Sequence, residues 1–392
     1  INLTQVIPIQ HFTGYTHRNI VRVIVSVTND IVTDQRVARS CEVLEKLGYE
    51  VLLVGRKLKH STAIDRKYST KRMRLLFNKK VFFYAEYNIR LFFLLLFNKV
   101  DILFANDLDT LLPNVLVARI KKIPIVYDSH EYFVGMPELV GRNIVKATWQ
   151  KIERYCIPKV DQMITVNESI ANMYITEYKR DVNIIRNISS QKKYQEIESE
   201  CKIDIDTPYI IYQGAINIQR GLEETIAAME YIEGYKFVIA GDGDILADLK
   251  ETVSKLNYCD KIIFTGRLSP EELAKYTKNA SLGISPELDS CINYRYCLPN
   301  KLFDYINAHI PVLVSNLAEM KSLVTRYNLG EIIESHKPQN LANQINSILN
   351  NKSKLNEYIT SAKKASEELC WEVESKILDR IMLQVCKPTI NK

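Results

Sequence analysis

One group of side chains able to bind a phosphorylated ligand lies within residues 285–305, SPELDSCINYRYCLPNKLFDY. Leu298 and Asn300 flank a proline that is expected to open a helix, and the free N–H groups at a helix N-terminus attract phosphate. Lys301 adds a cation, and the Asp304 carboxylate can accept hydrogen bonds from sugar hydroxyls. A plain capped helix with a surface Lys–Asp pair explains these residues equally well, so both interpretations stay open.

A second candidate phosphate-binding segment is 212–222, YQGAINIQRGL, at the end of a β-rich run. Gly214 allows a tight backbone turn there, and the planar guanidinium of Arg220 matches the oxygen geometry of a diphosphate. A turn glycine followed by a solvated arginine would give the same local pattern. Taken alone, this segment therefore favours the simpler structural interpretation.

A pair of glycines follows a further β-rich run in the segment 240–244, AGDGD. Gly241 and Gly243 permit a ligand to approach the backbone closely. The segment is not the GxGxxG of dinucleotide-binding folds, because residue 246 is leucine. The pair is more typical of a simple turn, and it indicates a ligand site only in combination with the other segments.

Two polar segments in the first half, 105–109 (ANDLD) and 127–131 (YDSHE), also follow apolar runs. If those runs are parallel strands, Asp107, His130 and Glu131 lie outside the carboxyl ends of the sheet, where ligands bind in such folds. The alternative is that Asp107 only caps the following helix and that His130 is a hydrogen-bonded loop residue.

The elements that would position these residues alternate between β-rich runs and helical patterns, which predicts an α/β fold with parallel sheets. The expected strands are 21–27, 49–54, 101–105, 124–127, 162–166 and 183–185, then 209–212, 236–240, 261–265, 280–285, 311–315 and 330–333. Long helical patterns are expected over 137–157 and from about 339 to 386. The polar stretch 188–207 separates the two halves, so we expect two domains that face each other across a ligand-binding cleft.

Composition excludes several classes of protein. The 392 residues are 46% hydrophobic and 25% charged, with a net charge of +6, so collagen, wholesale disorder and disulfide-dense scaffolds are ruled out. The eight cysteines are scattered without a CxxC pair, which favours a reducing cytosol over a zinc or dithiol site. The longest apolar run, 91–97, is too short to span a bilayer.

The positive charge concentrates in one stretch. Residues 51–100 contain 12 Lys or Arg and two acidic residues, interleaved with Phe, Leu and Tyr. This pattern over 56–99 is typical of a segment that contacts an anionic membrane surface, although a solvated basic face over a buried helix fits as well. No nucleic-acid-binding motif is present, so we expect no nucleic-acid partner.

Taken together and in order, these segments resemble the retaining glycosyltransferases of family 4 (glycosyl transferases group 1), which have the GT-B fold of two facing Rossmann-like domains. The resemblance extends over nearly the whole chain, from DQRVARSCEVLEKLGYEV through DILFANDLDTLLP and IPIVYDSHEYF to IIFTGRLSPEEL and LPNKLFDYINAHIPVLVSN. It implies an acceptor-binding domain over 1–187 and a donor-binding domain over 188–370. A C-terminal helix over about 371–392 would pack back on the first domain.

The resemblance also implies roles for individual residues. The diphosphate of a nucleotide-sugar donor would be bound by Gly214, Arg220, Lys301 and the backbone around Leu298 and Asn300. The base would lie against Gly241, Gly243 and the stretch 265–268, which includes Arg267, and Asp304 would hold the ribose. His130 would contact the transferred sugar, and Asp107 would lie near the acceptor. No metal ligands and no cofactor are expected, and UDP and GDP sugars are the expected donors.

The sequence departs from the family pattern at three places. The first acid of the E-x7-E motif, eight positions before Asp304, is Tyr296, and whether Glu287 or Asp289 replaces it cannot be read from the spacing. The arginine that often follows the phosphate-loop glycine is Ala215. The first loop, 28–33, lacks the usual glycine pair.

The expected function is therefore metal-independent transfer of a hexosyl group, with retention of configuration, to a hydroxyl of a lipid-linked acceptor or a growing surface glycan. This would be a step in cell-envelope polysaccharide synthesis, performed in the cytoplasm or peripherally on the inner face of the membrane. Two alternatives stay open. One is a non-catalytic nucleotide-sugar-binding partner of a transferase, favoured by Tyr296. The other is a nucleotide-sugar 2-epimerase, for which the sequence offers no paired carboxylates.

Overall fold

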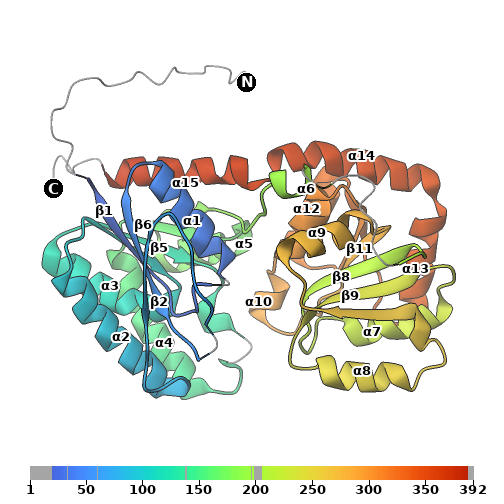
Figure 1. Cartoon of the computed structure of the whole chain (residues 1–392), viewed down its shortest axis with the longest axis horizontal. Helices are drawn as coiled ribbons and strands as arrows, with labels where there is room; N and C mark the ends of the chain where they lie inside the picture. The colour runs from blue at the N-terminus through green and yellow to red at the C-terminus, as the bar shows by residue number, and fades with distance from the viewer. Residues whose placement is uncertain are drawn as a thin grey trace, which may run out of the picture.

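The computed structural model describes residues 20–32, 34–59, 61–136, 139–195, 197 and 205–386. Within these residues the chain forms two α/β domains, each built on a parallel sheet (Figure 1). The first sheet has seven strands in the order β3-β2-β1-β4-β5-β6-β7. Its strands are β1 Arg22–Ser26, β2 Glu50–Arg56, β3 Ser69–Met73, β4 Ile102–Asn106, β5 Ile125–Ser129, β6 Gln162–Thr165 and β7 Asn183–Ile184.

The second sheet has six strands in the order β10-β9-β8-β11-β12-β13. These strands are β8 Tyr209–Ala215, β9 Lys236–Asp242, β10 Ile262–Gly266, β11 Leu282–Ser285, β12 Val312–Val314 and β13 Gly330–Ile332. The expected α/β class with two parallel-sheet domains is therefore confirmed. The mainly apolar central strands are buried because helices cover both faces of each sheet, as parallel sheets require.

The helices divide into two layers in each domain. On the first sheet, α2 Lys80–Phe97, α3 Leu108–Lys121, α4 Asn143–Cys156 and α5 Glu168–Tyr178 share one core, whereas α1 Gln35–Lys46 and α15 Trp371–Val385 cover the other face. On the second sheet, α7 Leu222–Ala228, α8 Leu246–Ser254 and α13 Pro338–Asn350 cover one face. The opposite face is covered by α6 Lys192–Gln195, α9 Pro270–Lys278, α11 Asn300–Asn307, α12 Ala318–Tyr327 and α14 Lys352–Glu368.

Each sheet reverses its strand order at one point: between β1 and β4 in the first domain, and between β8 and β11 in the second. At such a reversal the loops leaving the two neighbouring strands diverge and open a crevice at their carboxyl ends. Asp107 follows β4, and Gly214 and Ala215 lie at the end of β8. The fold thus brings the candidate segments to the crevices of the two sheets.

The chain crosses between the domains at two places that lie side by side. Arg186, just after β7, donates two hydrogen bonds to Glu374 of α15, and the Trp371 amide donates to the Ser189 carbonyl. Leu378, Ile381 and Met382 of α15 are buried in the core of the first domain. Figure 1 shows α14 along the second domain and α15 along the first, at the upper edge of the view.

Two parts of the secondary structure differ from the expectation. The basic stretch holds a short strand, β3, and an 18-residue helix, α2, for which the sequence analysis had defined no boundaries. The helix expected over 137–157 begins only at Asn143. A 3-10 turn, Phe133–Gly135, precedes it, and residues 137 and 138 lie outside the described residues. The expected segments before residue 20, after residue 386 and over most of 196–204 also lie outside them.

Candidate functional site

The first-domain part of the site is a cluster of charged side chains around His130. The His130 Nδ1 atom lies 3.2 Å from Asp107 Oδ2, and its Nε2 atom lies 3.4 Å from Asp128 Oδ2 and 3.2 Å from Asn106 Oδ1. The His130 backbone amide also donates to Asp107 Oδ1 at 2.9 Å. Asp107 and His130 come from the ends of adjacent strands, β4 and β5, so the parallel register brings them together.

The two carboxylates keep the His130 ring charged. Burial alone would lower the pKa of His130, but Asp107 and Asp128 outweigh it and raise the pKa to about 10. Asp128 is itself buried, and Arg36 of α1 binds it in a two-pronged ion pair with N···O distances of 2.7 and 3.0 Å. Although burial opposes ionisation, Arg36 and His130 hold the pKa of Asp128 well below its usual range. At neutral pH the ring is therefore a fixed imidazolium.

Asp107 of this cluster and the neighbouring Asp109 lie in unusual environments. The Asp107 backbone has φ +59° and ψ 163°, a conformation that costs a non-glycine residue free energy and is concentrated at functional sites. Asp109 is buried, with Thr28 donating to its Oδ2 atom at 2.5 Å and no partner for Oδ1 among the described residues. Burial, reinforced by the charge of Asp107, raises the pKa of Asp109 to about 7.

The second-domain part of the site holds two cations and one carboxylate. Lys301 Nζ donates to Glu287 Oε1 at 2.7 Å and lies 3.6 Å from the centre of the Tyr212 ring. Arg220 Nη1 lies 3.6 Å from the same Glu287 oxygen. Lys301 and Glu287 are buried, with side-chain exposures of 6% and 0%, whereas Arg220 is 23% exposed. Among the described residues the Arg220 Nε atom has no hydrogen-bond partner.

The backbones of the glycine segments approach each other closely beside this cluster. Gly214 has φ +131°, and a Cβ atom there would lie 3.6 Å from Lys301 Cε. A Cβ atom at Gly241 would clash with the Gly214 carbonyl at 1.9 Å, and one at Gly243 would clash with the Ile216 carbonyl at 2.2 Å. These positions need glycine for packing of the strand ends, which is sufficient to explain Gly241 and Gly243 without a ligand.

The other predicted donor-site residues lie in different surroundings. Asp304 accepts hydrogen bonds from Ser189 at 2.8 Å and from Gln213 at 2.7 Å, one on each oxygen. Its carboxylate is thus already engaged within the protein, and ribose binding by Asp304 stays a prediction. Leu298 is partly buried against the core, whereas Asn300 and Arg267 are exposed at the start of α11 and after β10. Pro299 occupies the N-cap of α11, so the predicted helix start is confirmed.

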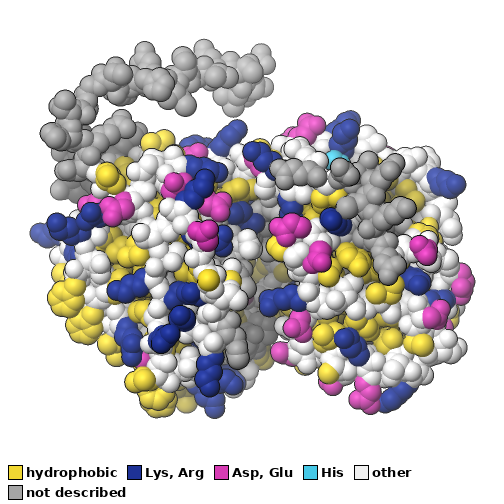
Figure 2. Space-filling view, in the orientation of Figure 1, with side chains coloured by type: hydrophobic (Ala, Val, Ile, Leu, Met, Phe, Trp, Pro, Cys, Tyr) yellow, Lys and Arg dark blue, Asp and Glu magenta, His cyan; other side chains and the backbone are white. Residues whose placement is uncertain are grey.

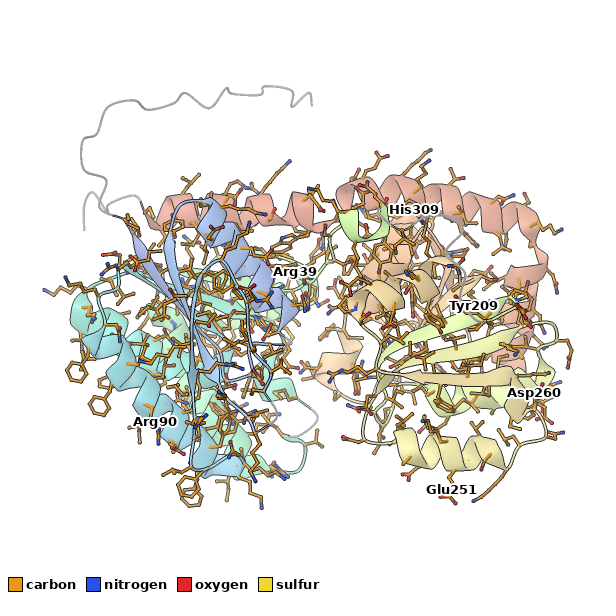
Figure 3. The ribbon with its side chains drawn as sticks, viewed as in Figure 1. Arg39, Arg90, Tyr209, Glu251, Asp260 and His309 are labelled. Carbon is orange, nitrogen blue, oxygen red and sulfur yellow. The ribbon has the colours of Figure 1, made fainter. Side chains whose placement is uncertain are left out.

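A loop of the second domain reaches across to the first. Asn293 of α10, Ile292–Arg295, donates to Glu131 Oε2 at 2.9 Å, next to His130. The Tyr296 carbonyl accepts from Asn167 at 2.7 Å, and the Tyr296 side chain packs against the first-domain core. This residue, which stands at the position of the first motif acid, contacts the first domain. Figure 3 shows Arg39 of α1 at the same boundary between the domains.

Sequence reasoning missed several members of the site. Glu287 was left open and joins the donor-site cations, whereas Asp289, the other candidate, is exposed and pairs with Arg295. Arg36 and Asp109 were not singled out. Spacing carries no signal for Arg36, which lies 92 residues from its partner Asp128. Asp109, in contrast, follows a strand within the segment that already drew attention to Asp107.

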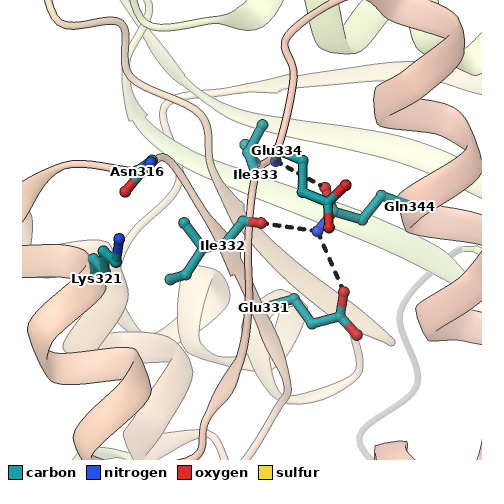
Figure 4. A pocket seen from close by; sticks show the side chains of 7 residues that line it. All are labelled: Asn316, Lys321, Glu331, Ile332, Ile333, Glu334 and Gln344. Carbon is teal, nitrogen blue, oxygen red and sulfur yellow. Dashed lines mark hydrogen bonds between the residues drawn. The ribbon is translucent and has the colours of Figure 1, made fainter.

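Two surface cavities lie away from these clusters. One, of about 380 Å³, opens beside β13 and is lined by Asn316, Lys321, Glu331, Ile332, Ile333, Glu334 and Gln344 (Figure 4). The Gln344 amide donates to Glu331 and to the Ile332 carbonyl inside it. The second, of about 520 Å³, lies between α3 and the end of α15. Neither cavity contains a predicted site residue, so they add nothing to the site.

Comparisons with known proteins identify the family of each half of the chain. Residues 34–188 match the family described as Glycosyltransferase Family 4, and residues 193–365 match Glycosyl transferases group 1. The alpha-monoglucosyldiacylglycerol synthase of Streptococcus pneumoniae is 25% identical over 193 residues, 44% of this chain and 43% of that protein. The chain thus matches less than half of that relative's length.

Solved structures of low sequence identity share the fold over almost the full length. A sucrose-phosphate synthase from Thermosynechococcus elongatus superposes with a TM-score of 0.75 at 16% identity, covering 93% of this chain and 99% of that one. The Anabaena protein HepE, solved in complex with UDP-glucose, gives a TM-score of 0.68 at 12% identity, covering 92% of this chain and 99% of that one.

The chain therefore has the GT-B fold of two facing Rossmann-like domains. It belongs to the family 4 glycosyltransferases, with a glycosyl transferases group 1 domain as its second half.

Proposed function

We propose that this glycosyltransferase moves a hexosyl group from a nucleoside-diphosphate sugar, of UDP or GDP type, to a hydroxyl acceptor. We further propose that transfer retains the anomeric configuration and needs no divalent metal. The observation that carries the proposal is the pair of cations, Arg220 and Lys301, at the crevice between β8 and β11. The UDP-glucose complex of the structural neighbour HepE supports a nucleotide-sugar donor.

The cation pair suits a leaving diphosphate because negative charge grows there as the glycosidic bond breaks. Fixed cations aimed at developing charge are often the largest catalytic contribution. In this chain Lys301 and Arg220 would supply that stabilisation without a metal ion. His130, held as an imidazolium, would contact the transferred sugar and orient it, with one ring N–H exchanging its present protein acceptor for a sugar hydroxyl. The leaving phosphate would then accept the proton of the acceptor hydroxyl.

The donor is tested by a thermal-shift panel of UDP, GDP, ADP, CMP and dTDP, with and without Mg²⁺. A ligand at 100 times its dissociation constant adds about 2.7 kcal/mol of stability. We expect a selective shift with one diphosphate that does not depend on Mg²⁺. A shift that requires Mg²⁺ would contradict metal independence. No shift with any nucleotide would favour a non-catalytic protein, and an anomeric assignment of the product by NMR tests retention.

We also propose that the acceptor is lipid-linked and that helix α2 brings the enzyme to an anionic membrane surface on the cytoplasmic side. One face of α2 packs into the domain core through Phe83, Tyr87, Leu91 and Leu95. The other face leaves hydrophobic side chains in solvent at helical spacing: Phe82 is 67% exposed, Ile89 59%, Phe93 50% and Phe97 79%. Figure 2 shows hydrophobic side chains at the left and lower edges of this domain.

Charge supports a membrane as the occupant of this exposed face. Lys79, Lys80, Arg90 and Lys99 are exposed on or beside α2, and cations next to inserted aromatic rings favour anionic headgroups. None of the described helices is long and apolar enough to cross a bilayer. The similarity to a synthase whose name contains a diacylglycerol lipid also supports a lipid-linked acceptor.

Co-sedimentation with vesicles of phosphatidylglycerol and phosphatidylcholine tests this membrane contact. We expect salt-sensitive binding that the double variant Phe82→Ser/Phe93→Ser weakens at least tenfold, because each buried phenyl ring contributes about 1.5–3 kcal/mol. Ile359→Ser is the matched control, since Ile359 is 40% exposed on α14 of the second domain. Equal binding by wild type and the double variant would contradict a role for α2.

A further inference from the structure

The buried carboxylate of Glu287 stands among the groups that would bind the donor diphosphate. It follows β11 directly, with Ser285 donating to Oε2 at 2.7 Å and Lys301 donating to Oε1 at 2.7 Å. The loop that carries Glu287 packs tightly against the loop 216–221, which follows β8. The Leu288 amide donates to the Gln219 carbonyl, and a Cβ atom at Gly221 would clash with the Pro286 carbonyl at 2.0 Å.

Stability alone is a weak reason for this carboxylate. A buried ion pair contributes little net stability, because desolvation of both charges offsets their attraction. A third charge lies beside the pair, since Arg220 is 3.6 Å from Glu287, and its Nε atom has no hydrogen-bond partner in the part of the chain that the structure describes. Lys301 Nζ is fixed between the Glu287 carboxylate and the Tyr212 ring, close to Gly214. Glu287 therefore determines where the Lys301 ammonium sits.

Glu287 also lowers the charge that the site offers to a ligand. Two cations and one carboxylate give the site a net charge of +1. The diphosphate of a nucleotide sugar carries a charge of −2 and becomes more negative when the sugar leaves. Ala215, which follows Gly214, adds no positive charge. The positive charge of the site is thus smaller than the negative charge of the nucleoside-diphosphate product that it must release.

Resting on the proposed function of the donor site, we propose that Glu287 is a positioning residue that fixes the Lys301 ammonium and weakens the hold of the site on the nucleoside-diphosphate product. A phosphate oxygen bound on the far side of that ammonium would lie roughly 5 Å from Glu287, about twice the length of a charge-assisted hydrogen bond. At that separation the repulsion between two unit charges changes affinity by roughly fourfold at the dielectric constant of water and by roughly 300-fold at an effective value of about 20.

The test is calorimetric titration of UDP and of GDP, separately, into wild type, Glu287→Gln and Asp289→Asn. We expect Glu287→Gln to bind the preferred diphosphate at least fourfold more tightly, because the amide keeps the shape and loses the charge. Both kcat and KM should fall, because the nucleoside-diphosphate product is released more slowly. Asp289→Asn removes a like charge from the same loop without touching Lys301 or Arg220, and it should bind as wild type does. A merely structural role for Glu287 would not tighten binding.

Other outcomes contradict the inference. Unchanged or weaker binding by a Glu287→Gln protein that melts at the wild-type temperature would overturn it. Failure of wild type to bind UDP or GDP would overturn the proposed donor site instead. If Glu287→Gln does not fold, wild type alone still provides a test. Because the site has a net charge of only +1, wild type should bind UDP less than about tenfold more tightly than UMP, and GDP less than about tenfold more tightly than GMP. A hundredfold preference for the diphosphate over the monophosphate would exclude the proposed role.

Discussion

The two domains place clusters of different net charge at equivalent positions of similar sheets. In the first, His130 and Arg36 are matched by the carboxylates of Asp107 and Asp128, and the neighbouring Asp109 has a pKa raised to about 7. In the second, Lys301 and Arg220 share one carboxylate, Glu287. The first cluster is close to neutral, whereas the second keeps one positive charge in excess.

This difference in net charge suits the two crevices to different kinds of ligand. A neutral, densely hydrogen-bonded cluster suits hydroxyl groups, which carry no charge but need oriented donors and acceptors. A crevice with excess positive charge suits an anion such as a diphosphate. Under the proposed function, the same topological position would serve a sugar or acceptor in one domain and a nucleotide in the other.

The largest effect that tests this division is expected from Lys301→Met. Removing the ammonium leaves the buried Glu287 carboxylate with the Ser285 hydrogen bond and the longer contact to Arg220, so we expect the free energy of unfolding to fall by about 3–5 kcal/mol. The thermal shift produced by the preferred nucleoside diphosphate should disappear. Denaturant unfolding and the nucleotide panel measure the two effects.

The double variant Lys301→Met/Glu287→Gln separates folding from binding. Loss of the buried charge should restore most of the stability, to within about 1–2 kcal/mol of wild type, because no unpaired ion remains. Nucleotide binding should stay lost. Binding that recovers together with stability would show that Lys301 acts only through the fold.

A smaller and different effect is expected from His130→Ala in the first domain. Turnover should fall at least tenfold, because the sugar loses an oriented donor, while affinity for the nucleoside diphosphate changes little. His309→Ala is the matched control: His309 is half-buried in the second domain, where Nε2 lies 3.1 Å from Ser366 Oγ (Figure 3). Unchanged turnover of His130→Ala would remove His130 from the site.

The sequence predicted the fold well because parallel sheets have a strong local signature. Most expected strands lie within a few residues of those in the structure, and Pro299 begins α11 as predicted. Strand β3 escaped notice because Ser69–Met73 is polar and mostly exposed. Helix α2 was hidden because it has hydrophobic residues on two faces, so its apolar periodicity is weak.

The site was only partly predictable, for a physical reason. Local motifs pointed to His130, Asp107, Arg220 and Lys301, each of which follows a strand or begins a helix. The carboxylates and cations that determine their charge come from elsewhere in the chain: Arg36 reaches Asp128 across 92 residues, and Glu287 reaches Lys301 across 14. Such pairs are created by packing, and a single sequence carries no local signal for them.

The smallest effect that we expect is a pH-dependent gain in stability from Asp109→Asn. The folded pKa of Asp109 is about 7, above its unfolded value of 3.8, because the buried carboxyl holds its proton. The wild type therefore loses stability as pH rises from about 4 to 7. An asparagine cannot titrate and can still accept the Thr28 hydrogen bond, so the variant should be more stable above pH 7, on the order of 2 kcal/mol, and nearly equal at pH 4.

Glu287 gives the opposite sign and so completes the comparison. Burial would raise the pKa of Glu287, but Lys301, Ser285 and Arg220 hold it below the ordinary value of 4.5. Its ionised form stabilises the fold above that pH, and this stabilisation is lost as pH falls. Denaturant unfolding from pH 3 to 9 should thus show that Asp109→Asn gains stability over wild type as the pH rises from about 4 to 7. Glu287→Gln should be less stable than wild type above about pH 4.5 and approach it as the pH falls further. If both variants changed stability in the same direction at neutral pH, the two carboxyl groups would not differ in their environments as the structure indicates.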